Sequence, residues 1–249
     1  MTKANKKTYF LTDLSEKPTE WLSVTEKNNF IKKVYRTFIY SLLFSAMTAY
    51  FGVCMELSFS LWWIILELVV FVICILAERN LFLLYLWTSL SGLTSAPILT
   101  NIINEGNENI IWQAILVTAI LFCILSLYVH YSKKTFSHWN LILFTVLVLC
   151  VLTIVPLIVF PNYTAIIIWT VIGIFLFSGY VLFDTSNIIN RYRPGDEVMA
   201  AMDLHLDFTN LFWDFLRLFR RNNAGAILDN ETITDTVIES DVDITDLID

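Results

Sequence analysis

Acidic side chains lie inside apolar stretches toward the C-terminal end of this chain. Asp184 ends one apolar run, and the next helical stretch contains Asp203, Asp207, Asn210 and Asp214. An ionisable residue at the centre of a membrane helix costs about 2.5–3.5 kcal/mol, so it usually faces a bundle interior or a water-filled path. At about 100° per residue, the four polar residues of the second stretch fall within about 60° of one another. The pattern predicts a helix whose polar face lines a wet or ion-paired path.

Asp184 lies close to where a last helix folding back along the preceding one would pass. Two carboxylates that face each other in a low-dielectric bundle cannot both ionise comfortably, so such a pair shares a proton. The pair would act as a pH-sensitive latch, because deprotonation adds like-charge repulsion and opens a path. The acidic stripe favours cations, Ca²⁺ in particular, since that ion prefers hard oxygen ligands. A purely structural polar contact between helices is the alternative, and the sequence leaves both open.

Two further polar residues, Glu67 and His205, also lie in apolar surroundings. Glu67 is either an acid that lines the cavity, as part of the cation path, or a neutral or paired acid between helices, and the sequence favours neither. His205 points more than about 150° away from the acidic stripe, so we interpret it as a packing residue. Its ordinary pKa of about 6.5 leaves a role in a pH response open.

The elements that must position these side chains are membrane helices. The chain has 249 residues, of which 57% are hydrophobic and only 16% are charged, which is typical of a polytopic membrane protein. About 20 apolar residues cross the hydrocarbon core. Six runs of roughly this kind are expected as helices, at about 34–55, 61–77, 81–103, 110–131, 139–160 and 165–183. The sequence therefore predicts an all-α membrane bundle.

The stretch that carries the acidic stripe, about 198–219, is expected to form one more helix. Pro194 and Gly195 precede it, and Asp196 and Glu197 suit a helix N-terminus. We favour a helix that is buried in the bundle or re-enters it. An amphipathic helix lying on the membrane surface is the alternative, although such helices usually carry Lys and Arg on the polar face.

Three regions are expected along the chain. Residues 1–33 form an N-terminal tail, residues 34–221 the transmembrane bundle, and residues 222–249 an acidic C-terminal tail. From Asp229 to Asp249 there are eight acidic residues and no basic one. A stretch of this composition, with Thr and Ser interleaved, is expected to be disordered.

The basic residues predict the orientation in the membrane, because cytoplasmic loops carry an excess of Lys and Arg. With the N-terminus in the cytoplasm, the tail and the inside loops contain thirteen of the 16 basic residues: Lys3, Lys6, Lys7, Lys17, Lys27, Lys32, Lys33, Arg36, Arg79, Lys133, Lys134, Arg191 and Arg193. The remaining three are Arg217, Arg220 and Arg221, at the end of the last helix. The charge bias places that end inside too, which a re-entrant helix or one lying within the bundle would satisfy.

Enzymatic activity is not expected. The chain contains no GxSxG or HExxH motif, its three histidines are not clustered, and its four cysteines show neither disulfide nor metal-ligand spacing. No cofactor and no nucleic-acid partner is expected. The expected partners are the lipid bilayer, calcium ions as the transported species, and other membrane proteins.

Several motifs resemble those of the Bax inhibitor-1 family, the transmembrane Bax inhibitor motif proteins. The most specific is the run DLHLDFTNLFWDFLRLF from Asp203 to Phe219, preceded by LFDTS at 182–186. FIKKVY at 30–35 and the stretch at 92–99, with Ala96 before Pro97, agree with it. The resemblance covers about 28–221, and the compact loops and short N-terminal tail are most similar to bacterial members.

The resemblance implies a seven-helix bundle with the last helix central, which acts as a pH-dependent calcium leak channel. It implies that Asp184 and Asp207 form the pH-sensing gate, and these two carboxylates are then also the candidate Ca²⁺ ligands. The family usually has a small or hydroxyl residue at the position of Asp203 and an aromatic residue at that of His205, so the pH midpoint or the ion preference is expected to differ. Some members pair the gate with a basic residue in the second helix, whereas this chain has none between Arg36 and Arg79.

Three functions remain open on the sequence. The first is the gated leak channel, with Asp203, Asn210, Asp214 and Glu67 along the cation path. The second is an interaction protein that modulates stress or cell death by binding other membrane proteins, and the third is a proton-coupled cation exchanger. The expected location is the bacterial plasma membrane, or the endoplasmic reticulum or Golgi if the source is eukaryotic or viral.

Overall fold

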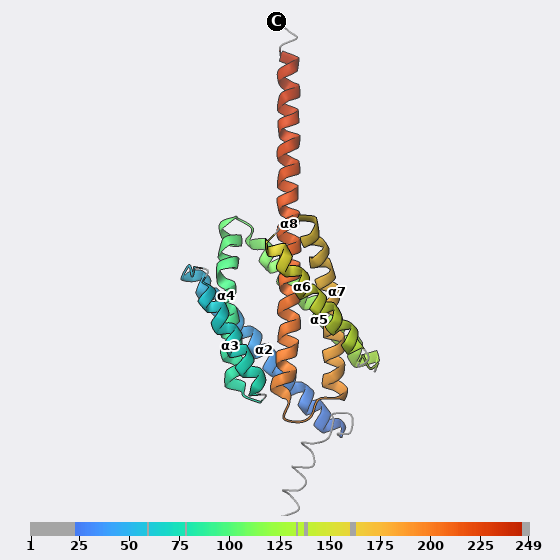
Figure 1. Ribbon diagram of the computed structural model, residues 1–249. Helices are drawn as coiled ribbons and strands as arrows, with labels where there is room; N and C mark the ends of the chain where they lie inside the picture. The colour runs from blue at the N-terminus through green and yellow to red at the C-terminus, as the bar shows by residue number, and fades with distance from the viewer. Residues whose placement is uncertain are drawn as a thin grey trace, which may run out of the picture.

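Seven helices make up the part of the chain that the structure describes. The computed structural model describes residues 23–245 apart from 59, 78, 133, 137–138 and 160–162. Within these residues, side chains are described as far as 221, with the further exception of 154–163. The helices are α2 (Val24–Cys54), α3 (Leu61–Leu76), α4 (Leu81–Asn104), α5 (Glu108–Ser132), α6 (Asn140–Val159), α7 (Tyr163–Asn190) and α8 (Glu197–Thr245), as Figure 1 shows. The predicted all-α bundle, with six apolar helices and one further helix, is confirmed.

Helix α2 begins at Val24, ten residues before the predicted start of the first apolar run. The reason is a capping box. The Ser23 side chain accepts a hydrogen bond from the backbone N–H of Glu26, and the Glu26 carboxylate accepts one from the N–H of Ser23 at 3.1 Å. These bonds satisfy backbone donors that the first turn of a helix leaves without partners, so the helix starts in polar sequence. Residues 1–22 of the expected N-terminal tail lie outside the described residues.

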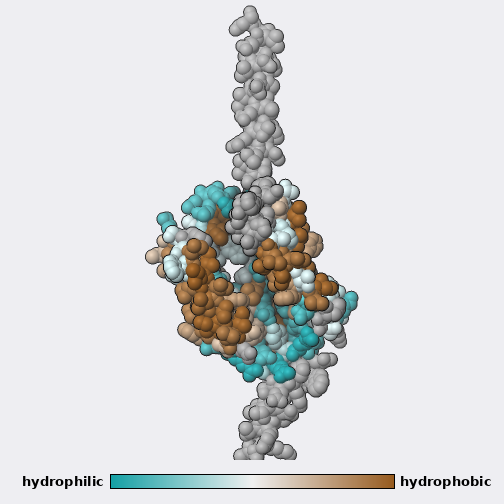
Figure 2. Space-filling view, viewed as in Figure 1, coloured by the Kyte–Doolittle hydropathy of each residue, from teal (hydrophilic) through white to brown (hydrophobic). Residues whose placement is uncertain are grey.

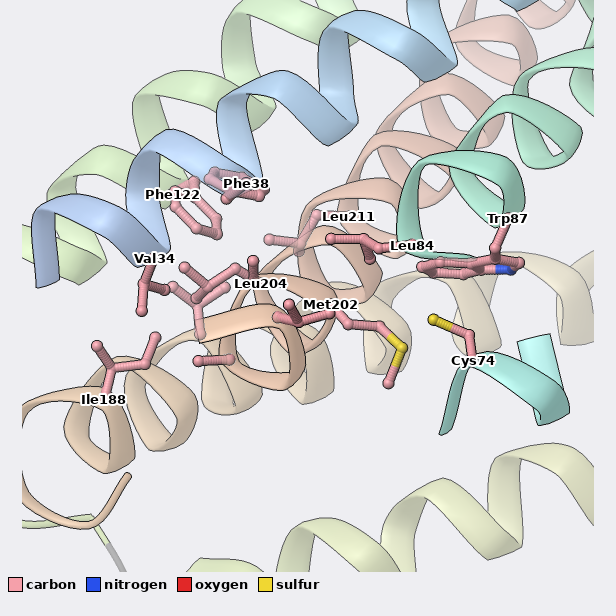
Figure 3. Packing of buried hydrophobic residues seen from close by; sticks show 14 of the residues in the cluster. Val34, Phe38, Cys74, Leu84, Trp87, Phe122, Ile188, Met202, Leu204 and Leu211 are labelled. Carbon is pink, nitrogen blue, oxygen red and sulfur yellow. The ribbon is translucent and has the colours of Figure 1, made fainter. Parts of the chain in front are cut away.

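Helix α8 lies at the centre of the bundle and contacts α2, α4, α5 and α7. Its apolar side carries Met202, Leu204 and Leu211, which are at most 3% exposed. They pack into one cluster with residues from the surrounding helices (Figure 3). The labelled partners are Val34 and Phe38 of α2, Cys74 of α3, Leu84 and Trp87 of α4, Phe122 of α5 and Ile188 of α7. The central position implied by the family resemblance is confirmed.

Helices α2 and α4 cross at very short range. A Cβ atom added to Gly92 of α4 would lie 2.1 Å from the backbone oxygen of Ser45 and 2.1 Å from Oγ1 of Thr48, both in α2. One added to Gly52 of α2 would lie 2.6 Å from Cβ of Ala96. Small residues on both helices therefore allow close backbone approach, which is a common way to pack helices in membranes.

Ion pairs show that α8 crosses the whole bundle. At its start, Asp196 and Glu197 pair with Arg79 at 3.1 Å and with Lys33 at 3.6 Å. We call this end the N-terminal face. It includes the start of α2 and the α3–α4, α5–α6 and α7–α8 connections. About six and a half turns further along α8, Arg220 pairs with Glu105 in the α4–α5 connection, at the opposite face. Of the two predicted paths, the helix that lies within the bundle is therefore the one that the structure has, and the re-entrant path back to the basic face is not.

Two of the three arginines near that end of α8 form ion pairs there instead. Arg217 pairs with Asp214 at 3.0 Å, Arg220 with Glu105, and Arg221 also has an interaction partner. The α8 backbone continues as a helix from residue 222 to Thr245, beyond the bundle in Figure 1. This helical backbone differs from the expectation of a tail without secondary structure.

The periphery of the bundle has the surface of a membrane protein. Four of the described helices, α2, α4, α5 and α7, are long and apolar enough to cross a membrane, and α3 and α6 contribute shorter apolar segments. Helix α3 packs on α4, and α6 on α7. Figure 2 shows hydrophobic residues over α3 on one side and α6 on the other, a hollow between them, and hydrophilic residues at both ends. This pattern is that of a protein whose sides face lipid and whose ends face water.

Candidate functional site

A cavity of about 660 Å³ lies between α6, α7 and α8. It brings together most of the residues that the sequence singles out: Asp184, Asp203, Asp207, Asn210 and Asp214 all line it. The remaining lining residues include Leu147, Cys150 and Val151 of α6, Ile166, Trp169, Gly173, Leu176, Phe177 and Tyr180 of α7, and Leu206, Trp213 and Arg217 of α8. The cavity is thus a mainly apolar and aromatic chamber into which one acidic stripe of α8 faces, as the helical periodicity predicts.

The carboxyl groups of Asp184 and Asp207 meet where α7 packs on α8. Asp184 is 8% exposed and Asp207 is 4% exposed. The two carboxyl groups are near neighbours and interact with each other. A carboxylate only accepts hydrogen bonds, so a bond between two carboxyl groups requires a proton on one of them. The structure therefore brings together two acids that can share one proton.

Further polar groups surround this pair on the side of the N-terminal face. Asn187 donates from Nδ2 to Oδ1 of Asp184 at 3.4 Å, and the hydroxyl of Tyr192 donates to Oδ2 of Asp203. Tyr192 lies in the α7–α8 connection, and its burial together with the neighbouring Asp203 carboxylate raises the pKa of its hydroxyl. The phenol therefore remains protonated and keeps its role as donor. These contacts form a layer of hydrogen-bonded side chains between the acid pair and the N-terminal face.

The other end of the acidic stripe is formed by Asp214. Its Oδ1 accepts a hydrogen bond from Arg217 at 3.0 Å, and its Oδ2 packs against Gly173 of α7. A Cβ atom at Gly173 would lie 2.3 Å from that oxygen, so a larger residue there would have to displace the Asp214 carboxyl group. Asp214 is 5% exposed, whereas the Arg217 side chain is 51% exposed, which places this end of the cavity near the surface.

Glu67 is not brought to the cavity. It lies on α3, is half-buried, and accepts a hydrogen bond at 2.6 Å from the hydroxyl of Thr94 on α4. This is the arrangement of an acid paired between helices, and Glu67 does not line the cavity with the α8 residues. The physical reason is that α3 packs on α4, away from the α6–α7–α8 cavity.

His205 lies on the side of α8 that faces away from the acidic stripe, as expected from its angular position. It is completely buried, its Nδ1 lies 2.9 Å from the hydroxyl of Ser41 on α2, and its ring packs edge-on against Trp87 of α4. Because the Ser41 hydroxyl donates to the carbonyl of Phe38 at 2.7 Å, the histidine is the donor in this contact. The residue therefore fastens α8 to α2.

A resident metal site is not apparent. Within the ranges that the structure describes, no group of three or more His, Cys, Asp or Glu side chains is placed to hold a metal ion. The assignment of Ca²⁺ to Asp184 and Asp207 stays a prediction, and it concerns a passing ion.

The sequence does not reveal three features of the site. Tyr192 carries no motif that marks it as the partner of Asp203. Gly173 stands out only as a small residue in an apolar helix. The aromatic wall formed by Phe177 and Tyr180 looks in sequence like any lipid-facing stretch, and only the packing of α7 beside α8 shows that it faces the cavity.

Comparison with known proteins places the whole bundle in one family. Residues 27–224 match the family model described as "Inhibitor of apoptosis-promoting Bax1". The match begins at the fourth residue of α2 and ends just beyond Arg221, so it includes every helix that lines the cavity.

Individual relatives come from bacteria, a fungus and a virus. An uncharacterized protein of Campylobacter jejuni is 32% identical over 212 residues, covering 80% of this chain and 91% of the relative. Bax inhibitor 1 of Schizosaccharomyces pombe is 36% identical over 143 residues, covering 56% of this chain and 52% of the relative. The Golgi anti-apoptotic protein of vaccinia virus is 31% identical over 144 residues, covering 58% and 59%. The similarity to the bacterial protein thus spans most of both chains.

Proposed function

This chain belongs to the Bax inhibitor-1 family of membrane proteins, and from that premise we propose that it is a pH-dependent leak channel for calcium and other cations, gated by Asp184 and Asp207. The observation that carries the proposal is the carboxyl pair itself. It lies buried between α7 and α8, at the end of a cavity lined by acids.

The gate would act through the charge of the pair. With one shared proton, the two carboxyl groups attract each other and hold α7 against α8. Loss of that proton leaves two buried negative charges, and their repulsion is strong at low dielectric. Asp203 adds a third carboxyl group near the pair, so the repulsion would rise further. Separation of α7 from α8 would then open the layer between the acid pair and the N-terminal face.

The cavity supplies much of the remaining path. Its lining on α8 runs from Asp203 to Arg217. At 1.5 Å per residue, these 14 steps correspond to about 21 Å along the axis, compared with about 30 Å for the hydrocarbon core. Carboxylates and the amide of Asn210 follow the whole length, and oxygen ligands of this kind suit Ca²⁺. A cation admitted by the gate would therefore meet acceptors at each turn.

Efflux of Ca²⁺ from proteoliposomes that contain the purified protein tests the proposal. Flux is measured from about pH 5 to about pH 8, a range chosen to titrate a carboxyl pair that shares a proton. We expect passive flux that rises with pH in the wild type. In Asp184→Asn and in Asp207→Asn the pair cannot carry two charges, so the pH dependence should disappear in either variant.

Glu67→Gln is the matched control, because it also neutralises an acid in an apolar helix but lies outside the cavity. Its pH profile should equal that of the wild type. Flux no greater than that of empty liposomes at every pH would refute a leak through the isolated protein. Proton movement in fixed ratio to Ca²⁺ would identify an exchanger in place of a channel.

A second candidate function is modulation of cell death through contacts with other membrane proteins. The names of two relatives, Bax inhibitor 1 and Golgi anti-apoptotic protein, favour it. Expression of wild type and Asp207→Asn in cells challenged with a death stimulus would separate the two functions. Equal protection by both proteins would indicate an interaction that does not need the gate.

We propose a cytoplasmic N-terminus and, in view of the bacterial relatives, the plasma membrane of a bacterium as the location. The N-terminal face contains Lys33, Arg79, Lys134, Arg191 and Arg193, in agreement with the charge bias of cytoplasmic loops. Reporter fusions to the α3–α4 and α4–α5 connections should report the cytoplasm for the first and the other side for the second.

A further inference from the structure

One face of α8 lines the cavity without being fully covered by another helix. Leu206, Asn210, Trp213 and Arg217 lie within about 60° of one another on the helix, because they follow at intervals of four, three and four residues. All four line the cavity between α6, α7 and α8. The first three are half-buried and Arg217 is exposed. We call these four residues the open stripe of α8.

The cavity opens sideways, toward the membrane. Among the described residues, α6 packs on α7 and has no packing of comparable extent on α8. Val151, in the middle of α6, lines the cavity and is 56% exposed. Its neighbours Leu149 and Leu152 are also exposed, as expected on the side of a bundle that faces lipid. The open side of the cavity therefore borders on hydrocarbon.

The walls of the cavity suit a hydrocarbon chain. Helix α6 contributes Leu147 and Val151, and α7 contributes Leu176 and Phe177. The volume of about 660 Å³ is in the range of pockets that hold organic molecules. An empty apolar space loses the van der Waals contacts of its lining, and in a membrane such contacts do much to hold apolar groups together. A lipid chain that enters from the side restores them.

The length of the open stripe matches one leaflet of the bilayer. Three residues beyond Arg217, Arg220 pairs with Glu105 in the α4–α5 connection, so Arg217 lies near the headgroup level of that face. From Arg217 to Leu206, eleven residues span about 16.5 Å along the axis of α8. One leaflet contributes about half of the hydrocarbon core of roughly 30 Å. An acyl chain anchored at Arg217 would therefore end near Leu206.

The charge at the outer end of the open stripe favours an anionic headgroup. The Nη1 of Arg217 donates to Oδ1 of Asp214 at 3.0 Å, and the Arg217 side chain is 51% exposed. Within the described part of the chain, no other carboxylate pairs with Arg217. A guanidinium group has five N–H donors in a fork that matches phosphate, so donors remain after the contact with Asp214. Trp213, one turn earlier, is of the type that is enriched at the membrane interface.

We propose that the cavity binds one anionic phospholipid of the bilayer. Its phosphate lies at Arg217, and one acyl chain lies between α6 and α8 along the open stripe, as far as Leu206. The lipid comes from the leaflet on the side of the α4–α5 connection.

Native mass spectrometry of the full-length protein tests this binding without any measurement of transport. The protein is released from nanodiscs that contain equal amounts of phosphatidylglycerol and phosphatidylcholine with identical chains. We expect one retained lipid per protein. We expect phosphatidylglycerol to be preferred about fivefold, the factor for one basic side chain at an anionic lipid. No retained lipid, or equal retention of the two lipids, would overturn the proposal.

Variants test the two ends of the lipid separately. Leu147→Trp places a larger side chain in the cavity and should abolish retention of the lipid. Leu149→Trp is the matched control, because it makes the same change on α6 at an exposed residue that does not line the cavity. Arg217→Gln should retain a lipid but lose the preference for phosphatidylglycerol. Equal retention in the two tryptophan variants, or an unchanged preference in Arg217→Gln, would show annular lipid only.

A fluorescence measurement needs no change to the cavity wall of the wild type. Brominated acyl chains quench a tryptophan that they touch. The signal of Trp213 is obtained as the difference between wild type and Trp213→Phe, and that of Trp112, which is 70% exposed on α5, from Trp112→Phe. Brominated phosphatidylglycerol should quench Trp213 at a lower mole fraction than Trp112. Quenching of both at the same mole fraction would contradict a binding site in the cavity.

The outcome is independent of the proposed channel. Lipid retained by a protein without Ca²⁺ flux would refute the channel and leave the lipid site. Flux through a protein that retains no lipid would refute the lipid site and leave the channel.

Discussion

The close crossing of α2 and α4 makes Gly92→Ala a sharp test of the bundle. The added Cβ atom would lie 2.1 Å from the backbone oxygen of Ser45, whereas ordinary van der Waals contact begins at 3.4 Å. The hydroxyl of Thr48, also 2.1 Å away, can rotate, but the Ser45 oxygen belongs to the backbone of α2. The two helices would therefore have to separate by about 1.3 Å at this point.

The size of the effect follows from two opposing contributions. Forcing an extra methyl group into a well-packed interface costs about 1–3 kcal/mol. Because backbone must move, we expect the upper part of that range for Gly92→Ala. Replacing Gly by Ala within a helix contributes at most about 1 kcal/mol in the stabilising direction. The expected net loss is about 2 kcal/mol, or roughly thirtyfold in the unfolding equilibrium.

Gly179→Ala is the matched control for this substitution. Its Cβ would meet the far end of the Leu143 side chain at 2.8 Å, with the next atoms at 4.0 Å, and a leucine side chain can change its rotamer. We expect a change in stability smaller than about 1 kcal/mol. The assay is unfolding in mixed micelles by added sodium dodecyl sulfate, followed by circular dichroism. Equal losses in the two variants would refute the close approach of α2 and α4.

Two further predictions concern the connections at either end of α8. Burial and the Asp203 carboxylate raise the pKa of Tyr192. An ultraviolet difference titration of wild type against Tyr192→Phe should therefore show no tyrosine that ionises at the ordinary pKa of about 10. Ionisation of Tyr192 at that pH would contradict its contact with Asp203. Arg220→Ala should reduce stability by less than about 1 kcal/mol, because the side chains of Arg220 and Glu105 are each 43% exposed. The loss should be smaller still at high salt, which screens exposed charges. A loss of stability that salt does not alter would show that the ion pair is not solvated.

The helices of the bundle could be predicted from hydropathy, whereas some of their ends could not. Apolar runs place α3 and α4 within one or two residues. The start of α2 lies in polar sequence, where the capping box of Ser23 and Glu26 decides it. The path of α8 through the whole bundle was also not predicted. The rule that basic residues lie on the cytoplasmic side takes no account of specific partners, and Arg220 pairs with Glu105 at the opposite face.

For the site, helical periodicity was sufficient to predict which residues share one face of α8, but it could not predict which helices pack against each other. It correctly places Asp203, Asp207 and Asp214 on one face and His205 on the other, because a single angle per residue determines both. It gives no information about which helix lies beside which. Glu67 was therefore grouped with the path although α3 packs on α4, and Tyr192 was not recognised as a donor to Asp203.

The central position of α8 has a consequence for biosynthesis. The ribosome makes α8 after the six other described helices, yet α8 contacts four of them and supplies much of their common interior. Its aspartates make insertion into lipid as an isolated span unfavourable. The earlier helices are therefore expected to lie in the membrane with the central position unfilled until α8 is made. The interior then closes in one late step, when α8 enters between them.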